Sequence, residues 1–156
     1  MIEYGHNGLL VFLSLLVAMV AGFTGLSLTK DLSSRSFSQR KIAVALASFA
    51  LGGGIWSMHF VAMLGLQMPI LFYYDAAITL VSALIAILLV AVALGLLHFT
   101  NRTPVTIIAA GGITGVGILA MHYVGMAGLQ LCTAVYTTSG LLIATVAALF
   151  MCVMAF

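Results

Sequence analysis

Charged side chains are scarce in this chain of 156 residues, in which Asp, Glu, Lys and Arg together make up only 5%. In a soluble domain, charged residues make up about a quarter of the sequence. Hydrophobic residues make up 64%, so too little charge is left to cover a water-facing surface. This excludes a soluble monomeric domain and indicates an integral membrane protein. The sequence also has no basic stripe interleaved with aromatic residues, so nucleic-acid binding is not expected.

Other scarce residue types exclude further classes. The two cysteines, Cys132 and Cys152, are too few for a disulfide framework. The three acids, Glu3, Asp31 and Asp75, do not cluster as the carboxylates of a di-metal hydrolase do. The sequence also offers no nucleophile–base pair and no phosphate-cradling loop beside charge. Catalysis by this chain is therefore not expected.

Five long apolar segments predict an all-α fold, a polytopic bundle of about five transmembrane helices. The first run has no Lys or Arg before it and no small-residue cleavage site after it, so it is a retained helix rather than a signal peptide. The first four segments reach the ~20 residues that a spanning helix needs. The fifth is short and stops at the chain end, so we expect truncation before further helices or an output domain. The segments are residues 9–28, 42–66, 76–97, 105–129 and 140–156.

Basic residues in the loops predict the orientation. Lys30, Arg35, Arg40 and Lys41 lie between the first two segments, and Arg102 lies between the third and fourth. Because cytoplasmic loops carry the excess of Lys and Arg, both loops are expected inside. The N-terminus is then outside, and the C-terminus is cytoplasmic.

Two stretches, residues 52–66 and 115–129, share one pattern. Both read G-x-G-I-x-x-M-H-aromatic-V-x-M-x-G-L, at a separation of 63 positions, from Met58 to Met121. Tyr-containing loops recur on the same outer side. The chain is therefore interpreted as one transmembrane domain, residues 1–156, made of parallel repeats of a two-helix unit. The repeat units are about residues 4–67 and 73–130, with the start of a third from 136.

The repeated histidines are the first candidate functional residues. Parallel repeats imply a pseudo-rotation axis along the membrane normal, so His59 and His122 should lie at equivalent depths. A histidine inside a bilayer is costly and is by default a functional candidate. Met63 and Met126 lie four residues after the histidines, on the same helix face. The alternative interpretation is that the histidines only form interhelical hydrogen bonds and the methionines only fill the core.

The donor types favour copper. Zinc prefers thiolate, imidazole and carboxylate, and calcium and magnesium prefer oxygen, whereas Cu(I) accepts imidazole and thioether together. The methionines directly before the histidines point about 100° away on an ideal helix and rank lower. The candidate metal ligands are His6, His59, His122, Met63 and Met126, with Met58, Met121 and Cys132 as weaker candidates.

The sequences M-H-Y-V-G-M at residues 121–126 and M-H-F-V-A-M at 58–63 resemble the signature of the MHYT family. This family comprises bacterial integral membrane sensor domains, and the resemblance covers nearly the whole chain. Phe60 departs from the family tyrosine, and Val61 and Val124 depart from its threonine. These departures leave the presumed ligands, the motif histidines and methionines, intact.

The resemblance implies a sensory input domain in the bacterial inner (plasma) membrane. Family members are fused to cytoplasmic output domains, often enzymes that make or degrade cyclic di-GMP. A bound metal, proposed to be copper, is suggested to sense O2, CO or NO. The family unit generally has more than five transmembrane segments, which also points to truncation.

Four hypotheses remain open from the sequence. The first is a copper-binding sensor of a diatomic gas or of redox state. The second is a haem-binding sensor with His59 and His122 as axial ligands. The third is a small metal transporter, and in the fourth the histidines only hold helices together. The expected partners are the lipid bilayer, a metal ion, a diatomic gas and a cytoplasmic output domain, and a homodimer is also open.

Overall fold

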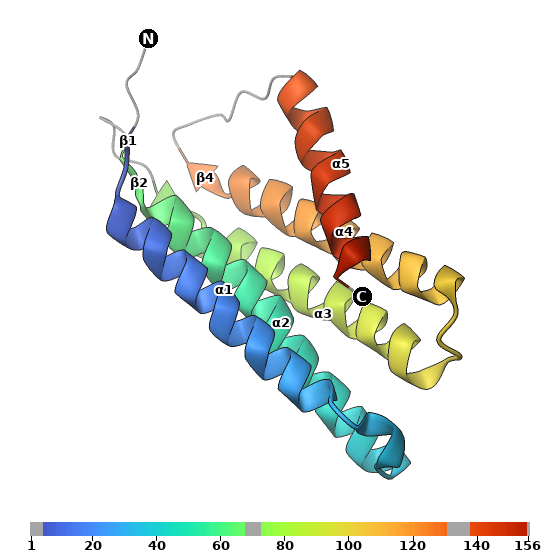
Figure 1. Cartoon of the computed structure of the whole chain (residues 1–156). Coiled ribbons are helices and arrows are strands. Elements are labelled where there is room, and N and C mark those ends of the chain that lie inside the picture. The colour runs from blue at the N-terminus through green and yellow to red at the C-terminus, as the bar shows by residue number, and fades with distance from the viewer. Residues whose placement is uncertain (1–4, 68–72, 131–137, 156) are drawn as a thin grey trace.

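The computed structural model describes residues 5–67, 73–130 and 138–155. Within these residues the chain folds into two antiparallel helical hairpins, with a fifth helix packed alongside the second hairpin (Figure 1). The predicted all-α bundle of five helices is confirmed. The helices are α1 (Gly8–Thr29), α2 (Phe37–Leu64), α3 (Ala76–Phe99), α4 (Pro104–Ala127) and α5 (Thr138–Met154), and a short 3-10 turn, η1 (Leu32–Ser34), follows α1.

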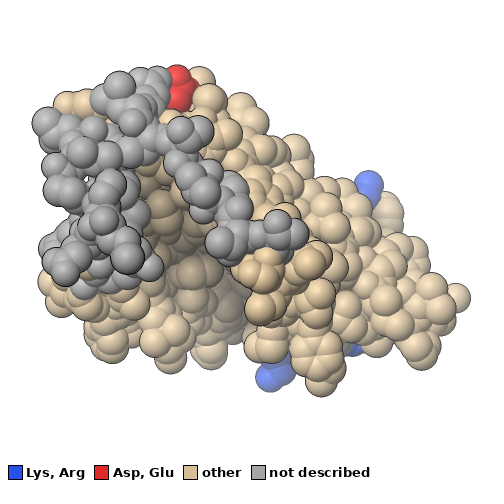
Figure 2. Space-filling view, turned by 90° about the horizontal axis from the view of Figure 1, so that it is seen from above, with Lys and Arg blue, Asp and Glu red and all other residues tan. Residues whose placement is uncertain are grey.

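Four of the helices, α1 to α4, are long and apolar enough to cross a membrane, and α5 is a shorter apolar helix. Their outward surfaces carry large apolar side chains; Phe23, for example, is 76% exposed. The space-filling view is correspondingly almost free of charged atoms over the helices (Figure 2). Lipid is the solvent in which such a surface is stable. The chain is a multi-pass membrane protein.

Polar caps set where α2 and α4 begin. Ser36 and Gln39 form a capping box before α2, and Thr103 and Thr106 form one before α4. Each box satisfies backbone N–H groups that the first helical turn leaves without partners. The helix α2 begins at Phe37, five residues before the apolar run that starts at residue 42, because its first turns are polar.

Two short strand pairs close the hairpins at one end, which we call the strand end. Strand β1 (Gly5–His6) pairs antiparallel with β2 (Leu66–Gln67), and β3 (Tyr73–Tyr74) pairs with β4 (Leu129–Gln130). The backbone N–H of Asn7 donates to the Gly65 carbonyl at 2.8 Å, and that of Asp75 donates to the Gly128 carbonyl at 2.8 Å. The sequence analysis did not predict these strands. Their repetition shows that both hairpins are built alike. The opposite end, with the α1–α2 and α3–α4 connections, is the loop end.

Glycines bring the helices of different hairpins together. Gly52 of α2 lies against the backbone of Ile87 in α3, and Gly115 of α4 lies against Leu149 of α5. The two glycines are 63 residues apart, from 52 to 115, so α4 receives α5 as α2 receives α3. At Gly53, by contrast, an added Cβ would meet nothing within 4 Å. Small residues permit this approach in lipid, where van der Waals contact drives helix association.

Candidate functional site

The two motif histidines face each other between α2 and α4. The ring centroids of His59 and His122 are 4.8 Å apart, and the ring planes are inclined by 73°. Each histidine lies five residues before the end of its helix, at Leu64 and Ala127 respectively. Both therefore sit at the strand end, at matching depth, as the repeat predicts. Both rings are partly buried and line one cavity.

A cavity of about 230 Å³ adjoins the histidine pair. α2 and α4 form most of its wall, and α5 contributes two alanines. Five of the side chains around it carry donor atoms, namely two imidazoles, two thioethers and the phenol of Tyr123. The lining residues are Ile55, Met58, His59, Ile118, Leu119, Met121, His122, Tyr123, Ala144 and Ala148.

The methionines at the cavity differ from those that helical spacing ranked first. Met58 and Met121 line the cavity, and the Met121 side chain is only 1% exposed. Met63 and Met126 are partly buried but are not among the lining residues. The ideal-helix argument considers one helix at a time. The cavity instead lies between α2, α4 and α5. On both α2 and α4 its wall therefore includes the methionine that directly precedes the histidine.

Two further candidates cannot be placed at this cavity. The backbone of His6 lies in β1, but its side chain lies outside the described part of the structure, and Cys132 lies outside the described residues altogether. Among the described residues, no group of three His, Cys, Asp or Glu side chains could hold a metal ion. The described structure thus brings His59 and His122 together, and the side chains of Met58 and Met121 line the same cavity.

An aromatic cluster supports the histidine helix from the side of α3. The rings of Trp56 and Phe60 lie 4.9 Å apart, and Phe60 meets Tyr74 at 5.5 Å. The Trp56 Nε1–H donates to Ser82 Oγ at 3.1 Å, and the Ser82 hydroxyl donates to the Thr79 carbonyl at 2.6 Å. The sequence analysis missed this cluster. The single tryptophan, which breaks the repeat where the second copy has leucine, was the available signal.

Tyr74 lies in β3, outside the helices that cross the membrane. Burial raises the pKa of its phenol, because desolvation disfavours the phenolate. The side chain therefore remains a neutral hydrogen-bonding group beside Phe60 at ordinary pH.

Fold and site together define a class of protein, a multi-pass membrane domain of repeated helical hairpins with two histidines paired between its helices. Comparison with protein families agrees. The chain matches the MHYT family, described as "Bacterial signalling protein N terminal repeat", over residues 52–111 and 115–156. The chain belongs to this family. The two matches begin 63 residues apart, from 52 to 115, which is the period of the histidine motif.

Curated relatives are signalling proteins. The chain is 39% identical to the bifunctional diguanylate cyclase/cyclic di-GMP phosphodiesterase MucR of Pseudomonas aeruginosa strain PAO1, over 83% of this chain and 19% of that protein. It is 40% identical to the cyclic di-GMP phosphodiesterase NbdA of the same organism, over 78% of this chain and 15% of the relative. The chain is 28% identical to the signaling protein YkoW of Bacillus subtilis strain 168, over 86% of this chain and 17% of that protein.

The chain spans less than a fifth of the length of these relatives. No solved structure matches it. Because the match covers the family's repeat region, the chain is a membrane sensory domain of the bacterial signalling type.

Proposed function

We propose that this domain binds one copper ion between His59 and His122, and that it reports a diatomic gas (O2, CO or NO) or a redox change to a cytoplasmic output domain. The output domain would be a cyclic di-GMP enzyme, as the names of MucR and NbdA suggest. The facing of the two imidazoles at 4.8 Å is the observation that carries the proposal.

The separation of the rings fits a single ion. Imidazole nitrogens bind first-row metals at about 2.0 Å, and two such ligands near a tetrahedral angle have ring centroids about 5 Å apart. The observed 4.8 Å between His59 and His122 is close to this value. Little rearrangement of α2 and α4 would be needed for both rings to reach one ion.

The donor set supports copper over other metals. The cavity offers imidazole nitrogen from His59 and His122 and thioether sulfur from Met58 and Met121. Cu(I) accepts both donor types, whereas magnesium and calcium need oxygen ligands. When bound, copper would supply a one-electron redox couple and an open position for a small ligand. The chain's own residues orient the donors and keep the cavity apolar.

Haem is less well supported by the same geometry. Axial histidines stand on opposite faces of the macrocycle, which places their ring centroids about 6 Å apart. Sites for organic cofactors generally occupy about 300–1,000 Å³, whereas the cavity beside His59 and His122 holds about 230 Å³. No observation in the described structure favours a transporter.

The helix packing supplies a route for the signal. Gly52 of α2 lies against Ile87 of α3, and Gly117 of α4 lies against Leu89 of α3. Residues two apart on a helix point to nearly opposite sides. α3 is therefore held between the two motif helices, and any change in the separation of the histidines moves α2 or α4 against it. A ligand that favours one arrangement shifts the equilibrium by its differential binding free energy.

This route reaches the loop end through Arg40. Its guanidinium donates to the backbone carbonyl of His98, which joins the first turns of α2 to the last turn of α3. The loop end is also where the positive-inside rule places the cytoplasm. A shift of α2 at the histidines would thus move the loop end, where an output domain could respond.

Elemental analysis of the purified protein after anaerobic loading with Cu(I) tests the site. We expect one copper per chain after washing, and loss to background in the His59→Ala/His122→Ala double variant. The His98→Ala variant is the matched control, because it removes a histidine from the other end of the bundle and should keep full loading. Copper at background in the unaltered protein would refute the proposal.

A second comparison tests the sulfur ligands. Met58→Leu/Met121→Leu should weaken copper binding by at least roughly tenfold, the smallest loss usually seen when a metal site is disturbed. Met63→Leu/Met126→Leu should change it less than twofold, since these residues do not line the cavity. Leucine preserves volume in both pairs. The reverse order would restore the ranking by helical spacing.

A further inference from the structure

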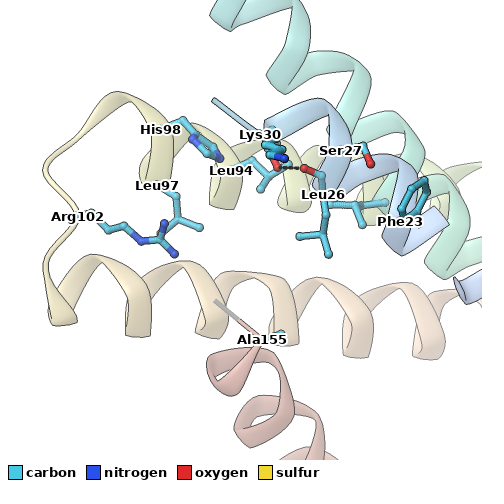
Figure 3. Close-up of a pocket in the computed structure, with 11 residues that line it drawn as sticks. Phe23, Leu26, Ser27, Lys30, Leu94, Leu97, His98, Arg102 and Ala155 are labelled. Carbon is cyan, nitrogen blue, oxygen red and sulfur yellow. Dashed lines mark hydrogen bonds between the residues drawn. The ribbon is translucent and has the colours of Figure 1, made fainter. Parts of the chain in front are cut away.

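A second and larger cavity, of about 560 Å³, opens at the loop end. It lies between α1, the end of α3, the α3–α4 connection and the end of α5 (Figure 3). It is separate from the histidine pair, which lies at the strand end, and the proposed copper chemistry does not use it.

Basic side chains converge on this cavity. Lys30 follows α1, His98 lies in the last turn of α3, and Arg102 belongs to the α3–α4 connection, yet all three line the same space (Figure 3). None of the described residues that line it is acidic. Arg40 adds a further positive charge nearby, since its guanidinium donates to the His98 carbonyl. The positive charges of Lys30, Arg102 and Arg40 repel one another, so an anion among them lowers the energy of the site.

The first helices of the two hairpins bring two of these side chains to the cavity. Asn7 and Asp75 cap the first helices of the two hairpins at a separation of 68 positions, from 7 to 75. The same separation relates Lys30 to His98. The two hairpins therefore deliver a nitrogen-bearing side chain from equivalent positions, and the short connection after α3 adds Arg102.

The remaining walls are apolar and continue onto the lipid-facing surface. Leu94 is 3% exposed and lies inside, whereas Phe23 and Leu26 on α1 are 76% and 68% exposed. A soluble anion would contact only the basic groups. A phosphate that carries acyl chains would contact both parts, with its headgroup among the basic side chains and a chain along α1.

We propose that this cavity binds an anionic phospholipid, with the lipid phosphate among Lys30, His98 and Arg102 and an acyl chain against Phe23 and Leu26. Such a lipid would bridge α1 and the second hairpin at the loop end. It would bind whether or not copper is present.

Native mass spectrometry of the full chain released from nanodiscs tests the proposal. The nanodiscs contain phosphatidylcholine with increasing fractions of phosphatidylglycerol, and the retained lipids are counted by mass. The Lys30→Gln/Arg102→Gln variant should retain phosphatidylglycerol with roughly 30-fold lower affinity, because each basic side chain near the membrane surface contributes about a factor of five. Phosphatidylcholine retention should not change.

The matched control is Arg35→Gln/Lys41→Gln, which removes the same charge from the same end without touching the cavity lining. It should lower phosphatidylglycerol retention less than twofold. Equal losses of phosphatidylglycerol in the two double variants would overturn the proposal. Unchanged retention of phosphatidylglycerol by Lys30→Gln/Arg102→Gln would overturn it as well. The charge-preserving exchange Lys30→Arg/Arg102→Lys should restore binding, and a failure to do so in a helical protein would also count against the site.

A soluble arm separates the two sources of phosphate. Inorganic phosphate at millimolar concentration should not displace phosphatidylglycerol from the unaltered protein, because it gains nothing from the apolar walls. Displacement at that concentration would show a site for a free anion and would overturn the lipid assignment. If the Lys30→Gln/Arg102→Gln variant loses helical content, Arg102→Gln alone decides, with an expected loss of roughly fivefold.

Discussion

Gly52 is the position where the smallest chemical change should disturb the bundle most clearly. An ideal Cβ at Gly52 would lie 2.5 Å from Ile87 Cα, 2.8 Å from the Ile87 nitrogen and 2.9 Å from the Ala86 carbonyl oxygen. All three are backbone atoms of α3, so no side-chain rotation can make room. Carbon atoms in contact lie about 3.5–4.0 Å apart. In Gly52→Ala, α2 and α3 must therefore separate by about 1 Å.

The adjacent Gly53 isolates the cost of this separation. A Cβ at Gly53 would meet nothing within 4 Å, so Gly53→Ala keeps only the gain in helix propensity, about 1 kcal/mol. Gly52→Ala has the same propensity gain but adds the overpacking cost, about 1–3 kcal/mol. The difference between the two free energies of unfolding is then the packing term alone, about 1–3 kcal/mol in favour of Gly53→Ala.

Reversible unfolding in mixed micelles, followed by far-UV circular dichroism, measures this difference. Because His59 lies on the same helix two turns beyond Gly52, copper affinity should also fall in Gly52→Ala and stay unchanged in Gly53→Ala. If the two variants unfold with equal free energies and bind copper equally, then α2 does not approach α3 as the structure shows.

Three further predictions concern the surroundings of the site and the loop end. Ser82→Ala leaves the Trp56 indole N–H without its acceptor and should cost about 1–3 kcal/mol, with a shifted fluorescence of the single tryptophan; no shift would contradict the bond. Because burial raises the pKa of Tyr74, its contribution to stability is fully present below the unfolded pKa of about 10 and is lost as pH rises through the folded pKa. Unfolding measured between pH 8 and 11 should therefore show a steeper decline for the unaltered protein than for Tyr74→Phe, and equal slopes would refute this. Arg40→Gln removes the bond to the His98 carbonyl and should lower thermal stability by about 1–3 kcal/mol, and an unchanged midpoint would show that this link is unimportant.

Several features of the fold were predictable because they depend on local sequence. The run of α3 is long and predominantly apolar, and a helix satisfies the backbone groups of such a run in lipid. The boundaries of the repeat units remain a prediction, since the family matches begin in the motif helices rather than at the outer loops.

Other features were not predictable in detail. The pairing of β1 with β2 depends on two short segments separated by a whole hairpin, and two residues carry no periodicity. Met58 and Met121 could not be preferred over the methionines four residues after the histidines, because the choice depends on where a third helix, α5, closes the cavity.

The sequence by itself determined that this is a membrane protein of repeated helical hairpins, and that His59 and His122 occupy equivalent places in it. Hydropathy, caps and internal repetition act within a segment or between copies of a segment, so they can be recognised without coordinates. Only the tertiary structure decided that the two ring centroids lie 4.8 Å apart, which methionines line the cavity beside them, and that Lys30, His98 and Arg102 share another cavity. Those relations join residues far apart in the chain, and the close contacts of helix with helix set them.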